Sequence, residues 1–278
     1  MAEFSRETIT GRKNPLITRL SKLSDKKYRD EEGLFRIDGV KLFSEAVSSG
    51  VKSEYIFIAE SKRERLTREL ERELSCTEGT VIPVSDDVLA KLTDESAPQG
   101  IVAFAKKFVT QKPDIPRGGA FHALYLSSVR DPGNLGTMVR TALALGVDRV
   151  FVSADCADIY SPKTVRASMG TIFRQPLSIV EDGAQFANAI KSAGCELFAA
   201  ALNRSAKKLG EFDMPERVCF AVGNEGHGLS AEFINMCSGT VFIPMADGCE
   251  SLNAAMAAGV LMWEMQRDRL INMNKEEK

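Results

Sequence analysis

Apolar and polar positions follow one another along this chain as short apolar runs separated by longer amphipathic segments. The runs at 55–58 and 101–104 are rich in β-branched and aromatic residues, which is typical of buried strands. Between such runs, apolar residues recur three and four positions apart, which predicts helices at 40–49 and 61–74. Strands that alternate with helices predict an α/β fold.

The alternation is interrupted once, by a stretch rich in proline and glycine. Residues 107–119 (KFVTQKPDIPRGG) have little apolar content, which is typical of a linker. We therefore expect a small α/β domain at 1–107, a linker at 108–120 and a second domain at 121–278. The first domain has no obvious catalytic constellation, which favours a role in binding.

The second domain opens with the clearest unit of the chain. An apolar run at 124–126 predicts a strand, a polar turn follows, and a second apolar run at 150–152 predicts another strand. The helix between them is expected to start with Asn134 as its cap and to end at Gly146. Arg140 lies off the apolar face of this helix, so Asn134 and Arg140 either contact a ligand or serve as a cap and a solvated arginine.

Two later stretches, 220–230 and 241–253, repeat the pattern of an apolar strand that leads into a small polar loop and then a helix. Three such junctions can meet at one end of a parallel sheet, where α/β folds bind ligands. The string GNEGHG at 223–228 is not the dinucleotide-binding GxGxxG, and the chain has no phosphate-binding GxxxxGK motif.

Composition narrows the class of protein. The 278 residues are 44% hydrophobic, which is enough for a sizeable core, and no apolar run is long enough to span a membrane. The amino terminus has no apolar signal segment. Six cysteines without a CxxC pair, and only two histidines, favour a reducing cytoplasm and argue against a metal site.

Charge is distributed unevenly. The net charge is −2, yet the segment up to Arg29 has eight basic residues against three acidic ones. This segment includes a predicted helix at 14–23 with Asn14 as its cap and Pro15 at its first position. A basic segment on an acidic body fits contact with nucleic-acid phosphates, or it is a solvated helix face.

The three junctions carry motifs in a recognisable order and spacing, and they resemble those of the SpoU (TrmH-like) RNA 2′-O-ribose methyltransferases of the SPOUT superfamily. The likeness covers about 121–269. The motifs are NLGTMVR at 134–140, GNEGHG at 223–228, and IP at 243–244 followed by SLN at 251–253.

The resemblance implies a carboxy-terminal parallel-sheet domain with a trefoil knot, preceded by a smaller α/β domain that binds RNA. General topology rules argue against a knot, so it is expected on the resemblance alone. The resemblance also implies a homodimer and S-adenosylmethionine as the cofactor. The implied reaction is methylation of a ribose 2′-hydroxyl, in ribosomal RNA rather than transfer RNA, because the first domain resembles that of ribosomal RNA enzymes.

The implied catalytic residues are Arg140, Asn134, Glu225, Ser251 and Asn253. Because arginine stays protonated in proteins, Arg140 is a poor general base. We expect it to grip the adjacent phosphate and stabilise the developing alkoxide. Asn134 would orient the ribose or Arg140, and Glu225 would hold the loop or Asn134 unless it forms a structural ion pair. Ser251 and Asn253 would cap the last helix and contact substrate or cofactor.

The implied cofactor-binding residues are Gly223, Ile243 and Leu252. Gly223 removes a Cβ where a ligand meets the backbone. Ile243 and Leu252 would add apolar walls and main-chain hydrogen bonds, with core packing as the alternative. His227, at a variable position of the second motif, is a weaker candidate base.

Three other classes of protein stay open on the sequence. They are a transfer RNA methyltransferase, a catalytically silent RNA-binding protein that assists ribosome assembly, and an enzyme that acts on a small nucleotide. The intact set of polar motif residues disfavours the silent protein, and the basic segment with its extra domain disfavours the small-molecule enzyme. Binding of S-adenosylmethionine separates an enzyme from a silent RNA-binding protein.

Overall fold

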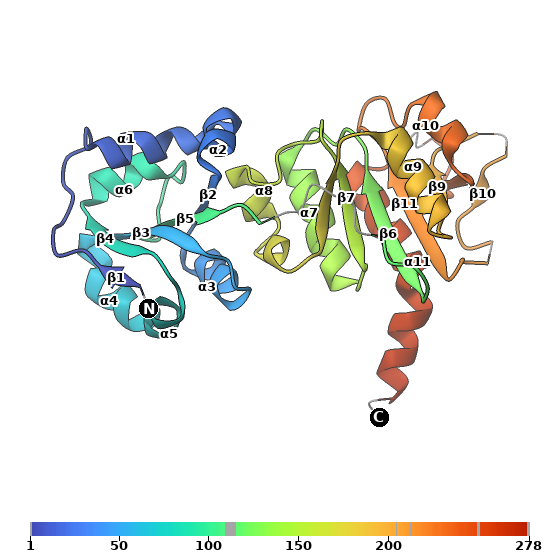
Figure 1. Ribbon diagram of the computed structural model, residues 1–278. Coiled ribbons are helices and arrows are strands. Elements are labelled where there is room, and N and C mark those ends of the chain that lie inside the picture. Colours follow the sequence, from blue (N-terminus) through green and yellow to red (C-terminus); the bar gives the residue numbers. More distant parts are fainter. Residues whose placement is uncertain (1, 109–114, 204, 212, 249–250, 277–278) are drawn as a thin grey trace. The chain divides into compact units, whose positions relative to one another are not determined.

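The protein divides into two compact units (Figure 1). The first takes Met1–Phe108 and Asp158–Arg174, and the second takes Val109–Ala157 and Gln175–Lys278. The chain thus leaves the second unit after its second strand, adds a short segment to the first, and returns. The computed structural model describes residues 2–108, 115–203, 205–211, 213–248 and 251–276.

These units differ from the predicted domains in one respect. The segment 158–174 lies within the region predicted as the second domain but packs in the first unit. The assignment of 1–107 to RNA binding, 108–120 to a linker and 121–278 to methyl transfer stays a prediction. Residues 109–114 of the predicted linker lie outside the described residues.

The first unit is built on a five-stranded mixed sheet with strand order β1-β4-β3-β5-β2. β4 is parallel to β1 and β3, whereas β5 is antiparallel to β2 and β3. The strands are β1 (Glu3–Phe4), β2 (Leu34–Asp38), β3 (Ser53–Ala59), β4 (Thr80–Val84) and β5 (Ile101–Lys106).

The helices predicted at 14–23 and 40–49 are present, the one predicted at 61–74 is divided, and α2 (Lys26–Glu32) was not predicted. Asn14 caps α1 through its Oδ1, which accepts from the Leu16 N–H at 2.9 Å, as predicted. The predicted helix at 61–74 is divided at Leu70, where φ is −108° and ψ is 21°, although Leu66, Leu70 and Leu74 are all buried as on one helix face. The helices and 3₁₀ turns are α1 (Pro15–Ser21), η1 (Lys22–Ser24), α2 (Lys26–Glu32), α3 (Val40–Ser48), η2 (Glu60–Lys62), α4 (Arg63–Glu69), α5 (Glu71–Cys76), α6 (Asp86–Leu92), α8 (Pro162–Ala167) and η3 (Thr171–Phe173).

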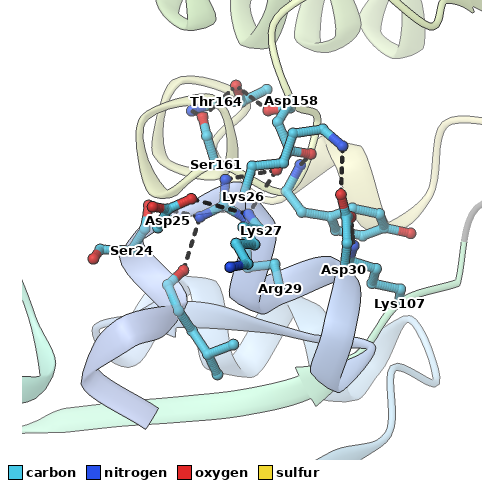
Figure 2. A network of polar contacts seen from close by, with 12 residues as sticks. Ser24, Asp25, Lys26, Lys27, Arg29, Asp30, Lys107, Asp158, Ser161 and Thr164 are labelled. Atoms are coloured by element: carbon cyan, nitrogen blue, oxygen red, sulfur yellow. Dashed lines mark hydrogen bonds and ion pairs between the residues drawn. The ribbon is translucent and has the colours of Figure 1, made fainter. Parts of the chain in front are cut away.

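A buried arginine joins the returning segment to the first unit (Figure 2). Arg29 of α2 is 3% exposed and donates from Nε and Nη2 to Asp158 Oδ2, at 2.8 and 2.6 Å. Its Nη1 donates to the carbonyl oxygens of Leu23 and Ser24. A buried charge needs such partners, so Arg29 stabilises the fold and is not one of the basic groups that can meet phosphate.

The second unit is built on a seven-stranded, entirely parallel sheet with strand order β10-β12-β9-β11-β6-β7-β8. This arrangement confirms the expected α/β fold with a parallel sheet, whereas the knot stays a prediction. The strands are β6 (Phe121–Leu126), β7 (Arg149–Ser153), β8 (Leu177–Val180), β9 (Glu196–Ala200), β10 (Lys207–Lys208), β11 (Arg217–Val222) and β12 (Gly239–Phe242).

Helices cover both faces of this sheet (Figure 1). α11 packs on α7, β6 and β11, while α9 packs on β9 and α10. All six residues of β6 are buried, as expected for a parallel strand between two helix layers. The helices are α7 (Pro132–Ala144), α9 (Gly183–Ser192), α10 (Ala231–Met236) and α11 (Ala254–Glu276). Within the described residues, no helix has both the length and the apolar character needed to cross a membrane.

Candidate active site

The three motif-bearing junctions meet in the second unit through a chain of side-chain hydrogen bonds. Asn253 donates from Nδ2 to Asn134 Oδ1 at 3.2 Å, and Asn134 donates from Nδ2 to Glu225 Oε1 at 3.1 Å. Each residue comes from a different motif, and Asn134 and Glu225 are 91 positions apart in the sequence. The structure therefore brings together three of the five predicted catalytic residues.

Asn134 does not cap α7, contrary to the sequence prediction. The helix begins two residues earlier, at Pro132, and Asp131 is its cap, with Oδ1 accepting from the Asn134 N–H at 2.8 Å. Proline suits the first helical position because its ring fixes φ near the helical value. The Asn134 side chain is thereby directed to Glu225 and Asn253 instead of to its own helix terminus.

Glu225 holds the start of α7 in place. Its carboxylate accepts from Asn134 and also from the N–H groups of Arg130 and Asp131, at 3.2 and 3.4 Å. Desolvation would raise the pKa of Glu225, but these hydrogen bonds outweigh it and leave the pKa below the ordinary value. Glu225 forms no ion pair with a described residue, so the predicted alternative of a structural salt bridge is not observed.

Asn253 and Ser251 lie at the start of the last helix. Asn253 Oδ1 accepts from the N–H groups of Ala255 and Met256, at 2.9 and 3.3 Å, so it caps α11 as predicted. The same side chain therefore fixes the helix and contacts Asn134. Ser251 precedes it and lines the pocket described below.

Arg140 is the predicted catalytic residue that the structure places apart. It is exposed on α7, six positions beyond Asn134, and no hydrogen bond or ion pair joins it to any of the described residues. It does not line the adjacent pocket. Its guanidinium is therefore available to a ligand from outside the protein.

A pocket of about 690 Å³ opens at the carboxyl ends of β9, β11 and β12, where α11 begins. All three predicted cofactor-binding residues, Gly223, Ile243 and Leu252, line it, together with Glu225 and Ser251. Leu252 is 39% exposed and Ile243 is partly exposed, so neither is a plain core residue.

The loop after β11 is tight because Gly223 has no side chain. A Cβ at this position would lie 2.2 Å from the backbone carbon of Gly228 and 2.4 Å from the nitrogen of Leu229. Asn224 and Gly228 exchange two backbone hydrogen bonds, of 3.1 and 2.9 Å, that close the loop. Glycine at 223 is therefore required for the loop itself to close, not only for the approach of a ligand.

Sequence reasoning missed part of the pocket wall. Leu202, Met245 and Asp247 line the pocket without belonging to the residues singled out from the motifs. Leu202 is 79% exposed, which is unusual for leucine beside a cavity. Its position two residues after β9 was the available signal, because ligands bind at the carboxyl ends of parallel strands.

The weaker chemical candidates lie elsewhere. His227 is exposed and lines a different cavity, which shares Asn224 and Gly228 with the pocket. Among the described residues, no cluster of three or more His, Cys, Asp or Glu side chains is arranged to hold a metal ion.

Comparison with known proteins identifies both regions of the chain. Residues 122–263 match the family model described as the SpoU rRNA Methylase family, and residues 14–103 match the one described as the MRM3-like substrate binding domain. The first match covers just over half of the chain.

Individual relatives agree over nearly the whole length. A 23S rRNA (guanosine(2553)-2′-O)-methyltransferase of Bacillus subtilis is 31% identical over 93% of this chain and 98% of its own. A 23S rRNA (uridine(2479)-2′-O)-methyltransferase of Streptomyces viridochromogenes is 30% identical over 89% of this chain and 88% of its own. The crystal structure of an AdoMet-bound rRNA methyltransferase from Sinorhizobium meliloti superposes with a TM-score of 0.82 at 29% identity, covering 94% of this chain and 98% of its own. The resemblance seen in the three motifs is thereby confirmed, and the chain belongs to the SpoU rRNA methylase family.

Proposed function

We propose that this protein transfers the methyl group of S-adenosylmethionine to a ribose 2′-hydroxyl of ribosomal RNA. The observation that carries the proposal is the joining of the three motifs, in which Asn253, Asn134 and Glu225 form one hydrogen-bonded chain beside the 690 Å³ pocket. Relatives that methylate 23S rRNA support ribosomal RNA over transfer RNA as the substrate. Three hydrogen-bonded polar side chains beside a pocket favour an enzyme over a catalytically silent RNA-binding protein.

The pocket suits S-adenosylmethionine. Leu202, Met245 and Leu252 are exposed apolar side chains around it, which is the surface that an adenine ring would cover. The Glu225 carboxylate lines the same pocket and suits a cationic ligand. When bound there, S-adenosylmethionine supplies a methyl group on positively charged sulfur.

The polar residues would position the RNA. Asn134 is held on both sides, by Glu225 and Asn253, so its amide orients the ribose with little loss of freedom on binding. Arg140 would bind the neighbouring phosphate through two parallel N–H groups and stabilise the negative charge that develops on the 2′-oxygen. Glu225 keeps α7, and with it Asn134, in register with the pocket.

The first unit has a surface suited to RNA. The Nζ atoms of Lys22 and Lys27 lie 5.3 and 5.7 Å from the ring centroid of Tyr28. The Cζ atom of Arg19 lies 5.7 Å from the ring centroid of Tyr55. Cations beside partly exposed aromatic rings can meet phosphates and stack on unpaired bases. We infer that this surface binds the RNA around the target nucleotide.

We also infer that the protein is a homodimer. Met256, Val260 and Trp263 are exposed on one face of α11, at spacings of four and three residues. An apolar stripe of this kind on a helix beside the active site fits a second copy of the chain. The described cysteines are all free, which supports a location in the reducing cytoplasm.

The experiment is a methyl-transfer assay with purified protein, labelled S-adenosylmethionine, and separate ribosomal and transfer RNA. We expect label in ribosomal RNA. After alkaline hydrolysis the label should be found in uncleaved dinucleotides, because a 2′-O-methyl group blocks cleavage of the adjacent phosphodiester. Label in transfer RNA alone would support the transfer RNA alternative. RNA binding without any transferred label would support the silent protein.

A further inference from the structure

A second cavity, of about 800 Å³, lies in the second unit at the carboxyl ends of β6, β7 and β8, against the starts of α9 and α10. β6 and β11 are neighbours in the sheet, but the chain continues from β6 towards β7 and from β11 towards β12 on the other side. A crevice of this kind, where the strand order reverses, is where α/β sheets bind ligands. The roles expected from the motifs do not include this cavity as a binding site, although His227 of the second motif lines it.

The wall of this cavity holds a strained residue. Ser128 has φ of +56°, which among the described residues other than glycine is matched only by Met169. Its N–H donates to Ser153 Oγ at 2.9 Å, its hydroxyl donates to Asp155, and its carbonyl accepts from Asn224 Nδ2 at 2.8 Å. Backbone strain that is held by several contacts at a cavity points to a functional site.

The chemistry of the walls fits a flat, polar-edged ligand. The floor is apolar, with Tyr125 stacked on Phe233 at 5.1 Å between ring centroids. The rim is polar and includes Arg130, Asp155 and His227. Arg130 pairs with Asp155 at 3.1 Å, so one rim offers both donors and acceptors. An apolar floor with such a rim suits the face and the edge of a nucleobase.

The cavity is also next to the proposed reaction centre. Asn224 and Gly228 line both this cavity and the 690 Å³ pocket, so the two cavities share part of the loop after β11. The Arg130 N–H donates to Glu225, so the rim of the cavity is directly connected to the Asn134–Glu225 pair.

We propose that this cavity receives the base of the target nucleotide, turned out of the RNA fold, while its ribose lies at the Asn134–Glu225 pair. This inference rests on the proposed function and deepens it by naming the subsite that reads the nucleotide. Enzymes that modify one nucleotide often move it out of its stack into a pocket, where its edge is read by hydrogen bonds.

A pair of neighbouring substitutions tests the proposal. Ala184 is exposed and lines the cavity, whereas Gln185 is exposed but does not line it, and the N–H groups of both donate to Asp182 at the start of α9. Ala184→Trp places an indole ring in the space proposed for the base, and we expect kcat/KM for RNA to fall by about 10- to 100-fold, the contribution of one stacked base. Gln185→Trp should keep wild-type kcat/KM. Affinity for S-adenosylmethionine, measured by calorimetry, should be unchanged in both.

A modified RNA tests the same claim with the wild-type protein. An abasic ribonucleotide at the methylated position keeps the ribose and its 2′-hydroxyl but lacks the base. We expect the wild-type rate on this RNA to fall as far as the rate of Ala184→Trp on normal RNA, with no further loss when the two changes are combined. An unchanged wild-type rate on abasic RNA, or additive losses, would overturn the proposal. No methylation of any RNA by the wild type would overturn the proposed function as well.

Discussion

Arg140 extends from α7 into solvent and has no hydrogen bond or ion pair within the described part of the chain. If it grips phosphate with its planar fork, Arg140→Lys should be almost as inactive as Arg140→Ala, because lysine keeps the charge but loses the paired donors. Turnover should fall by about 10²–10³-fold, as for loss of a preorganised donor. The melting temperature and the affinity for S-adenosylmethionine should stay near wild type, since Arg140 is exposed and does not line the pocket.

The measurement is turnover with RNA, melting temperature and cofactor affinity for each variant. If Arg140→Lys keeps most of its turnover, a point charge suffices and the paired geometry is irrelevant. If either variant unfolds or loses the cofactor, Arg140 supports the fold instead.

Single residues show how far sequence reasoning can go at this scale. Gly223, Ile243 and Leu252 could be assigned to one pocket, because loops after parallel strands meet at one edge of the sheet. The cap of α7 was predicted wrongly as Asn134, because Asp131 and Asn134 are equally good cap residues; Pro132, which suits the first helical position, is the sequence signal that favours Asp131. The bond between Asn134 and Glu225 links distant positions and has no local signature.

At the scale of elements, the loop between β11 and α10 makes a prediction with a built-in control. In Gly223→Ala the new Cβ would meet backbone atoms at 2.2 and 2.4 Å, so the paired Asn224 and Gly228 must move apart. In Gly226→Ala the nearest atom would be Asn224 Oδ1, at an ordinary 3.5 Å. We expect Gly223→Ala to lose S-adenosylmethionine affinity by at least about 10-fold and to lower the melting temperature, as strained substitutions do.

Gly226→Ala should leave the melting temperature unchanged by a measurable amount, which makes it the control for the backbone clash; its cofactor affinity is not a control, because Gly226 also lines the pocket. Thermal melting of the two variants checks this, and equal melting temperatures, or wild-type cofactor affinity in Gly223→Ala, would contradict the role given to the closed loop.

The contact between β6 and α11 predicts a pH dependence of stability. His122 Nδ1 donates to Gln266 Oε1 at 3.2 Å, while Gln266 Nε2 donates to the Gly146 carbonyl at 2.7 Å. Burial, and to a lesser extent the charge of Arg269, lowers the pKa of His122 below its ordinary value, against the opposing effects of Gln266 and Asp148. The unfolded chain therefore binds a proton more readily than the folded one.

Stability should consequently fall as the pH drops below about 6.5, the ordinary histidine pKa, and continue to fall until His122 itself protonates in the folded protein. His122→Gln should flatten this decline. Melting temperatures of both proteins between about pH 7.5 and pH 5.5 provide the comparison, in the range where histidine titrates. Parallel curves would show that His122 does not contribute.

Elements with a repeating pattern were predictable, whereas short ones were not. α7 agrees with the pattern because its 13 residues show a helical period, while β6 and β7 agree because they are short apolar runs, as buried parallel strands are. A helix was expected after the loop at 220–230, but the bounds of α10 could not be predicted, because six residues do not establish a helical period. The division at Leu70 could not be predicted, because Leu66, Leu70 and Leu74 are spaced as on one continuous helix.

At the scale of the whole molecule, the apolar face of α11 predicts the oligomeric state. Sedimentation at micromolar concentration should give twice the mass of the 30.4-kDa chain. Trp263→Glu, which places a charge within the face defined with Met256 and Val260, should be monomeric. Because Trp263 is the single tryptophan of the sequence, its fluorescence should shift to longer wavelength when the wild type dissociates on dilution. A monomer with full activity would contradict the dimer.

The division into units could be predicted only in part. The composition of 107–119 predicts a linker, and the chain passes between the units at Phe108–Val109, but the packing of 158–174 in the first unit depends on contacts such as Arg29 with Asp158, which are 129 positions apart. No periodicity or linker composition marks this excursion, because its apolar residues look the same whichever core they enter. Long-range topology of this kind has no local signal in the sequence.

We propose that this chain methylates one ribose 2′-hydroxyl of ribosomal RNA. The most direct measurement maps 2′-O-methyl groups on RNA from cells that contain the protein, lack it, or carry only Arg140→Ala. We predict one position in ribosomal RNA that is methylated with the wild type and unmethylated in the other two. Identical maps in all three, or a difference confined to transfer RNA, would contradict the account.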